Sequence, residues 1–176
     1  MNEASKLNVW SFRNIAQVAI EIIAVLAIIT AIQYWRSSDM LETDGTVAIQ
    51  PVQAVTLEGE ARPLFEQGQR NLLYFFAPWC TVCSFSVGSL DNINQQSMQV
   101  TAIALDYQSV EEVRAFSESH DMSVDVILGN NAIREQFEIL GYPSYYLLDE
   151  QQRVVGKHFG YTTSWHIKLQ NWITQI

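Results

Sequence analysis

The 176-residue chain is poor in the residue types that several classes of protein require. It has two cysteines and three scattered histidines, with no second CxxC, so a structural zinc site is not expected. Nineteen acids outnumber ten Lys and Arg residues, and the net charge of −9 argues against a nucleic-acid surface. No segment repeats at a fixed period or is of low complexity, which sets aside solenoids and linker-rich chains. The 48% of hydrophobic residues can fill one core.

Glycine and proline are absent from residues 15–34, an apolar stretch whose one charge is Glu21. As a helix it would be about 30 Å long, the thickness of the hydrocarbon core of a bilayer. A buried core helix is one alternative, but apolar residues cover every face over residues 22–32. A cleaved signal peptide is another, but small residues are not evident where cleavage would occur. We expect a membrane anchor over residues 15–35, with Glu21 reaching toward the headgroups.

The charges on either side of the apolar stretch predict its direction in the membrane. Two basic residues precede it, whereas three acids closely follow Arg36. The positive-inside bias therefore places the N-terminus in the cytoplasm. Residues 1–14 would be a cytoplasmic segment, residues 36–46 a linker, and residues 47–176 a folded domain on the far side of the membrane.

Alternating strand-like and helix-like patterns predict that this domain is α/β. An edge hairpin is expected around residues 47–60, strands at 71–77, 100–107, 124–128, 144–148 and 154–159, and helices at 80–95, 109–116, 131–137 and 164–176. Trp165, Leu169, Trp172 and Ile173 share one face of the closing helix, the face that a surface helix usually turns to the core. The sum is a mixed central sheet with helices on both faces, in which parallel crossovers give way to a terminal hairpin.

The two cysteines, Cys80 and Cys83, lie in the stretch APWCTVC at the start of an expected helix. At positions i and i+3 their sulfurs are close enough for a disulfide. Unpaired amides and the helix dipole would lower the pKa of Cys80, while Cys83 would be better shielded. A structural crosslink is the alternative, but so short a loop constrains the unfolded chain little. We interpret the pair as redox-active, with Cys80 attacking and Cys83 resolving a mixed disulfide.

Two stretches make the chain resemble the thioredoxin superfamily. They are FFAPWCTVC at residues 75–83 and GYPSYYLLDEQQRVVGKHFG at residues 141–160, and the resemblance extends over residues 47–176. The stretch between the two motifs leaves room for an extra strand and helix. With the anchor, this makes the chain similar to membrane-anchored TlpA/ResA-like proteins, including the suppressor-of-copper-sensitivity thioredoxins.

The resemblance implies a thioredoxin fold and three substrate-binding residues beside the cysteines. Pro143 would be a cis-proline lying against the pair, and the backbone of Tyr142 would bind an extended substrate segment. Trp79 would form a half-exposed wall beside the attacking sulfur. Without the resemblance, Pro143 would be an ordinary proline that opens a strand, and Trp79 could simply fill the core.

One departure from the family pattern affects the mechanism. Many cytoplasmic thioredoxins have a buried acid six residues before the first cysteine, which accepts the proton of the resolving thiol; here Tyr74 holds that place. The proton of Cys83 must therefore go elsewhere, to water or to an acid outside the motif such as Glu66. The dipeptide between the cysteines also leaves the reduction potential open.

The expected function is that of a membrane-tethered protein disulfide oxidoreductase in a Gram-negative periplasm. The resemblance favours reduction of disulfides or oxidised thiols in envelope proteins, with electrons from an integral-membrane thiol relay close to the tethered domain. The expected partners are those substrate proteins, the relay and the inner membrane; no cofactor, metal or nucleic acid is expected. Two hypotheses stay open: a thioredoxin-like binding or assembly module with incidental cysteines, and a copper-handling protein, although a Met- or His-rich tract is lacking.

Overall fold

The computed structural model describes the backbone of residues 3–93 and 98–175, and the side chains of residues 14–32, 38–93 and 98–175. The chain divides into two compact units, Met1–Ser38 and Asp39–Ile176. The first unit is one helix, α1 (Glu3–Ser37), which extends beyond the predicted apolar stretch at both ends. Its segment Asn14–Ile32 has a mean hydropathy of 2.5 and is long and apolar enough to cross a membrane, so the predicted helix is confirmed as a candidate span.

The second unit is built around a seven-stranded sheet in the order β2-β1-β5-β4-β3-β6-β7. Its strands are β1 (Gln53–Thr56), β2 (Ala61–Pro63), β3 (Asn71–Phe76), β4 (Gln99–Ala104), β5 (Asp125–Leu128), β6 (Ser144–Leu148) and β7 (Val154–Phe159). Its helices are α2 (Thr81–Ser86), the 3-10 helix η1 (Val87–Ser89), α3 (Val110–Ser119), α4 (Asn131–Gln136) and α5 (Ser164–Ile173). The predicted mixed α/β thioredoxin fold is confirmed.

The strand pairing matches the predicted change from parallel crossovers to a terminal hairpin. Strands β3, β4 and β5 are parallel neighbours, whereas β6 pairs antiparallel with β3 and β7 antiparallel with β6. The N-terminal hairpin of β1 and β2 begins later than expected, at Gln53. Pro51, which has no N–H to give to a sheet, therefore lies outside it.

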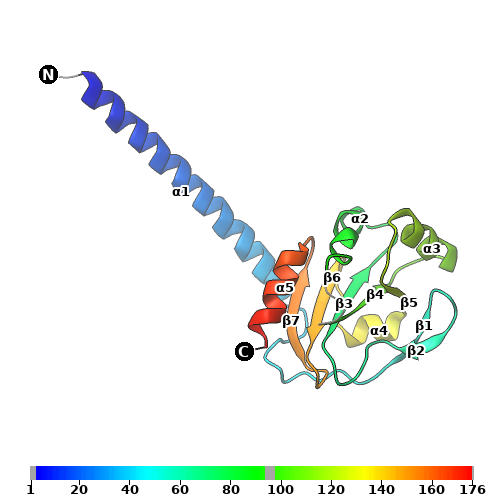
Figure 1. Cartoon of the computed structure of the whole chain (residues 1–176). Helices are drawn as coiled ribbons and strands as arrows, with labels where there is room; N and C mark the ends of the chain where they lie inside the picture. Colours follow the sequence, from blue (N-terminus) through cyan, green and yellow to red (C-terminus); the bar gives the residue numbers. More distant parts are fainter. Residues whose placement is uncertain (1–2, 94–97, 176) are drawn as a thin grey trace. The chain divides into compact units, whose positions relative to one another are not determined.

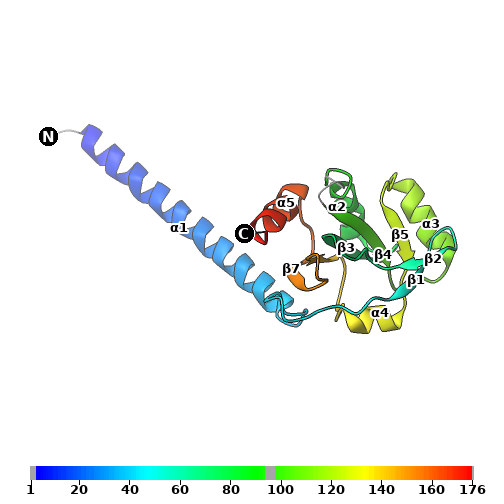
Figure 2. The same cartoon turned by 60° about the horizontal axis from the view of Figure 1, so that its bottom comes forward.

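Strand β3 is buried on both sides and separates two clusters of apolar side chains. Leu72, Tyr74 and Phe76 point into one cluster, and Leu73 and Phe75 point into the other. Helices α2, α3 and α5 contribute to the first cluster and α4 to the second, so helices cover both faces of the sheet, as Figures 1 and 2 show. This arrangement explains why the sequence of β3 is almost continuously apolar.

The helix after the cysteines is shorter than predicted. Helix α2 ends at Ser86 and passes into η1 instead of continuing to residue 95, and residues 94–97 lie outside the described residues. The hydroxyls of Ser86 and Ser89 donate to the carbonyls three residues earlier, at 3.1 and 2.6 Å. Such local bonds compete with the helical pattern, and Gly88 weakens it further.

The closing helix α5 faces the sheet with the opposite side from the one predicted. Ile167 and Asn171 are buried, while Trp165, Trp172 and Ile173 are exposed. The cause lies at the start of β3, where the side chain of Arg70 is also buried and donates to Asn171 Oδ1 at 2.6 Å. A buried guanidinium must be hydrogen-bonded, and this requirement turns a polar residue of α5 inward. The prediction for this face was wrong.

Candidate active site

The cysteine pair lies where the chain leaves β3 and begins α2. Cys80 and Cys83 form a disulfide, and their Cα atoms are 5.2 Å apart, within the usual range. Cys80 is the N-cap of α2, and its Sγ accepts a hydrogen bond from the backbone N–H of Cys83 at 3.1 Å. Cys80 is 7% exposed and Cys83 is fully buried. One sulfur therefore lies near the surface, bonded to an amide, and the other lies beneath it.

Trp79, just before the pair, is a largely exposed side chain held at its nitrogen. The residue is 61% exposed, and its Nε1–H donates to the backbone oxygen of Asp106 at 2.9 Å. The ring also meets that of Tyr142 edge to face, with centroids 5.9 Å apart. The indole therefore stands beside Cys80 as a fixed apolar surface.

Pro143 lies at the same end of the sheet. Its peptide bond with Tyr142 is cis, and its carbonyl oxygen accepts from the N–H of Gly160 at 2.8 Å. The next residue, Ser144, pairs with Phe75 of β3. Pro143 is buried. Because Ser144 pairs with Phe75 near the end of β3, Pro143 lies beside the segment that leads from β3 to the cysteines. Trp79, Tyr142 and Pro143 are therefore gathered at one end of the sheet, next to the cysteine pair.

An ion pair at this end of the sheet was not predicted from the sequence. Arg134 Nη1 of α4 lies 2.8 and 2.9 Å from the two carboxylate oxygens of Asp106, which follows β4. Burial, and after it the negative charge of Asp106, raise the pKa of Tyr142 above its ordinary value. Asp106 thus supports Trp79 through its backbone and acts on Tyr142 through its charge. The one signal in the sequence was the position of Asp106 just after β4. Because β4 is parallel to β3, both strands end at the same edge of the sheet.

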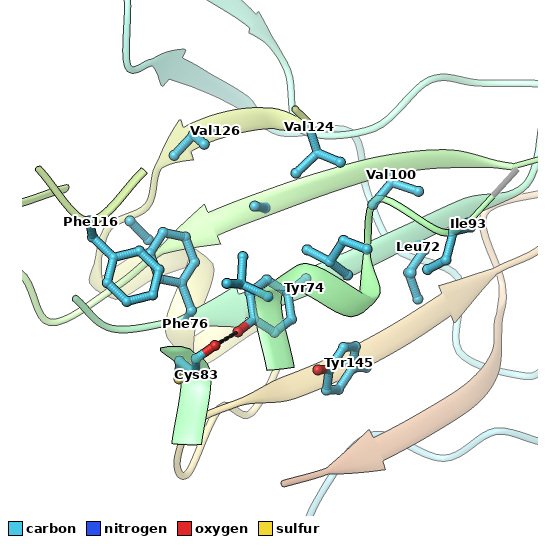
Figure 3. Packing of buried hydrophobic residues seen from close by; sticks show 14 of the residues in the cluster. Leu72, Tyr74, Phe76, Cys83, Ile93, Val100, Phe116, Val124, Val126 and Tyr145 are labelled. Atoms are coloured by element: carbon cyan, nitrogen blue, oxygen red, sulfur yellow. Dashed lines mark hydrogen bonds between the residues drawn. The ribbon is translucent and has the colours of Figure 1, made fainter. Parts of the chain in front are cut away.

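Tyr74, whose position was expected to matter for the proton of Cys83, points its hydroxyl toward the backbone of Cys83 (Figure 3). Its hydroxyl donates to the backbone oxygen of Cys83 at 3.3 Å and lies 3.0 Å from Ser86 Oγ. Burial raises the pKa of Tyr74 far above its ordinary value, so the hydroxyl stays neutral. Glu66, in contrast, contacts Asn71 at the opposite end of β3. The suggestion that Glu66 takes the proton of Cys83 finds no support in this placement.

The described residues hold no group of three or more His, Cys, Asp or Glu side chains that could bind a metal ion. His158 and His166 do meet, with ring centroids 5.1 Å apart, but His158 Nε2 is 3.1 Å from the backbone oxygen of Tyr161. Two histidines are fewer than the ligands that a protein zinc or copper site normally needs.

A thioredoxin fold with a disulfide-forming CxxC pair at the start of a helix defines the class of thioredoxin-like thiol:disulfide oxidoreductases. The chain belongs to the AhpC/TSA family, whose model matches residues 50–157. The resemblance to the thioredoxin superfamily is thus confirmed.

Similar proteins support the same assignment of fold. The chain is 27% identical over 114 residues to the thioredoxin-like protein YneN of Bacillus subtilis, which covers 61% of this chain and 67% of YneN. StoA of Bacillus subtilis superposes with a TM-score of 0.61 at 20% identity, over 69% of this chain and 96% of StoA. The exposed lipoprotein thioredoxin Etrx1 of Streptococcus pneumoniae gives 0.64 at 19% identity, over 70% of this chain and 99% of Etrx1.

Proposed function

We propose that the chain is a membrane-tethered oxidoreductase that reduces disulfides of envelope proteins through Cys80 and Cys83. The observation that carries the proposal is the asymmetry of the pair. Cys80 is near the surface and its sulfur accepts an amide hydrogen bond, whereas Cys83 is fully buried. The amide favours the thiolate of Cys80 over its thiol, which is the condition for nucleophilic attack.

The proposed reaction is a two-step exchange. In the reduced protein, the Cys80 thiolate attacks one sulfur of the substrate disulfide; a new S–S bond forms and the second substrate sulfur leaves as a thiolate. Cys83 gives its proton to water and its sulfur attacks the Cys80 sulfur; the Cys80–Cys83 bond forms, the mixed disulfide breaks, and the first substrate sulfur leaves as a thiolate. The substrate gains two electrons and the cysteine pair loses two. An integral-membrane thiol relay then reduces the pair again.

Trp79, Tyr142 and Pro143 are proposed to bind the substrate. They lie together at the end of the sheet that bears the cysteines, and the rings of Trp79 and Tyr142 are in contact. The exposed indole offers an apolar surface for side chains that flank the substrate disulfide. The backbone of Tyr142, next to the strand β6, would pair with an extended substrate segment.

The tether is proposed to be residues 15–35, followed by a linker over 36–46 and the catalytic domain over 47–176. The apolar segment Asn14–Ile32 supports a single span. The basic residues before this segment favour a cytoplasmic N-terminus and a catalytic domain in the periplasm, bound to the inner membrane. Tethering would hold the pair near the membrane relay at a high effective concentration.

The test uses the full chain and two matched variants, Cys83→Ser and Cys80→Ser, assayed on a model protein disulfide. We expect the wild type to reduce it and both variants to lose turnover. Cys83→Ser should accumulate a mixed disulfide through Cys80, which mass spectrometry identifies, and Cys80→Ser should not. If Cys80→Ser keeps its cellular function, the cysteines are incidental and the fold serves as a binding module. A wild-type chain that neither reduces nor oxidises any model disulfide contradicts the proposal.

A further inference from the structure

Helix α5 turns an apolar stripe toward solvent. Trp165, Trp172 and Ile173 are 69%, 61% and 55% exposed, and Leu169 between them is partly exposed. Their spacing of i, i+4, i+7 and i+8 puts these four residues, the α5 stripe, on one side of the helix. The other side is occupied by the hydrogen bond between Asn171 and Arg70. Contacts among the described residues of the second unit, 39–93 and 98–175, therefore leave the stripe uncovered.

A stripe with two exposed tryptophans has the composition of a helix that lies in a membrane interface. Tryptophan prefers the headgroup region, where its ring is in an apolar layer and its N–H can reach water. Interfacial helices present such a stripe to the lipid and basic residues beside it. Lys168 of α5 is exposed and flanks the stripe.

The distribution of charge favours an anionic lipid surface. The chain has a net charge of −9, yet Glu150 is its last acidic residue, and Arg153, Lys157 and Lys168 follow it. Arg153 is paired with Asp149 at 2.7 Å, so the basic side chains of β7 and α5 are Lys157 and Lys168, and neither element carries an acidic one. Anionic headgroups would attract this part of the domain and repel the acidic remainder.

The attachment point of the second unit lies next to α5. Met40 is buried, and its carbonyl oxygen accepts from Lys157 Nζ of β7 at 3.1 Å. Gln170 of α5 donates to the backbone oxygen of the same lysine at 3.4 Å. Residues 33–39 join this point to the end of the apolar segment at Ile32. The point at which the second unit is joined to the first therefore lies at its β7 edge.

We propose that the α5 stripe docks the second unit onto the anionic surface of the membrane in which the chain is anchored. The inference rests on the anchoring part of the proposed function and is independent of the redox chemistry. Docking would hold the cysteine pair in one orientation to the bilayer, in place of free rotation on the linker.

The experiment uses the full chain, labelled with 5-fluorotryptophan, in nanodiscs that contain phosphatidylglycerol and phosphatidylcholine. Trp→Phe variants assign each ¹⁹F resonance. We expect a nitroxide on the lipid headgroup to broaden Trp165 and Trp172, and a soluble gadolinium chelate to leave them sharp. Trp79 is the matched control, since it is 61% exposed, like Trp172. It should be broadened by the chelate and not by the lipid nitroxide.

Discs of phosphatidylcholine alone, or the variant Lys168→Glu, should reduce the lipid-induced broadening several-fold while the Trp79 resonance stays unchanged. The inference is overturned if Trp165 and Trp172 respond as Trp79 does. It is also overturned if neither reagent broadens them, because a second copy of the chain then covers the stripe. If alkaline carbonate extracts the chain from membranes, both the anchoring and the docking are overturned. The disulfide assay tests the redox chemistry separately and is unaffected by that result.

Discussion

Replacing Tyr74 by Phe removes one buried hydroxyl beneath the cysteine pair and leaves the ring in place. That hydroxyl bonds the backbone oxygen of Cys83 and lies 3.0 Å from Ser86 Oγ. Because burial raises the pKa of Tyr74 far above its ordinary value, the hydroxyl stays protonated throughout the pH range in which thiols and disulfides exchange. A hydroxyl that is already protonated cannot take the proton of Cys83. We therefore expect the substitution to affect stability and to leave the chemistry unchanged.

The expected cost is about 1 kcal/mol of the free energy of unfolding, the usual net value of one buried hydrogen bond. The ring contacts with Phe76 and Tyr145, at centroid distances of 5.7 and 4.9 Å, remain. Ser86 Oγ still donates to the Cys83 oxygen at 3.1 Å, so that acceptor keeps a partner. In the double variant with Ser86→Ala the oxygen loses both hydroxyl donors and keeps the backbone N–H of Val87. Because the two hydroxyls also contact each other, the loss should be smaller than the sum of the single changes.

Two measurements on the full chain in detergent test this reasoning. Thermal unfolding followed by near-UV circular dichroism should show a Tm lower by about 3 to 5 °C. The rate of disulfide reduction between pH 6 and 9 should follow the wild-type profile. Tyr145→Phe is the matched control, because this buried tyrosine belongs to the same cluster and its hydroxyl does not bond Cys83. If Tyr74→Phe slows exchange tenfold or displaces the pH profile, and Tyr145→Phe does not, the hydroxyl takes part in proton transfer.

Three further predictions concern the second unit. Gly129→Ala should lower the free energy of unfolding by about 1 to 3 kcal/mol, because the added carbon would lie 2.8 Å from a backbone oxygen of β4. Gly88→Ala, where nothing lies within 4 Å, should be neutral or stabilising, and urea titration of the two variants distinguishes them. Arg70→Leu should lower the free energy of unfolding by about 1 to 3 kcal/mol, because it leaves the buried Asn171 side-chain oxygen without its donor. Adding Asn171→Leu should recover part of the loss. Equal stability of the wild type and the single variant would refute this reasoning. Burial lowers the pKa of His158 in the folded state, so the unfolded chain binds more protons than the folded chain as the pH falls. The stability that neutral His158 contributes should be fully present above about pH 6.5 and should be lost as the pH drops toward the lowered pKa. His158→Gln should weaken this pH dependence in unfolding measured from pH 7.5 to 5.

Much of the sheet could be predicted because its strands have a local signature. Strands β6 and β7 begin and end where the sequence pattern placed them, and β3 is as fully buried as its apolar run implied. The position of the cysteines at the start of a helix also follows from local sequence, since Pro78 and the apolar run before it mark the transition. These features depend on neighbours in the chain.

Other features depend on contacts between distant residues, and the sequence could not supply them. The pattern of α5 showed two faces, but which face is buried is decided by Arg70, 101 residues away from its partner Asn171. Asp106 looks like any acid in a loop until the fold brings Arg134 and Trp79 to it. The bond from Tyr74 to the backbone of Cys83 likewise requires α2 to lie across β3.

The ionisation of the two thiols in the reduced protein tests the central claim most directly. The alkylation rate of each cysteine is measured by mass spectrometry as a function of pH, with free cysteine as the reference. We predict that Cys80 reacts with a pKa clearly below the value of about 8.5 for a free thiol, because the Cys83 amide bonds its sulfur. Cys83, which is fully buried, should react slowly across the range. A Cys80 that ionises no more readily than free cysteine contradicts the proposed mechanism.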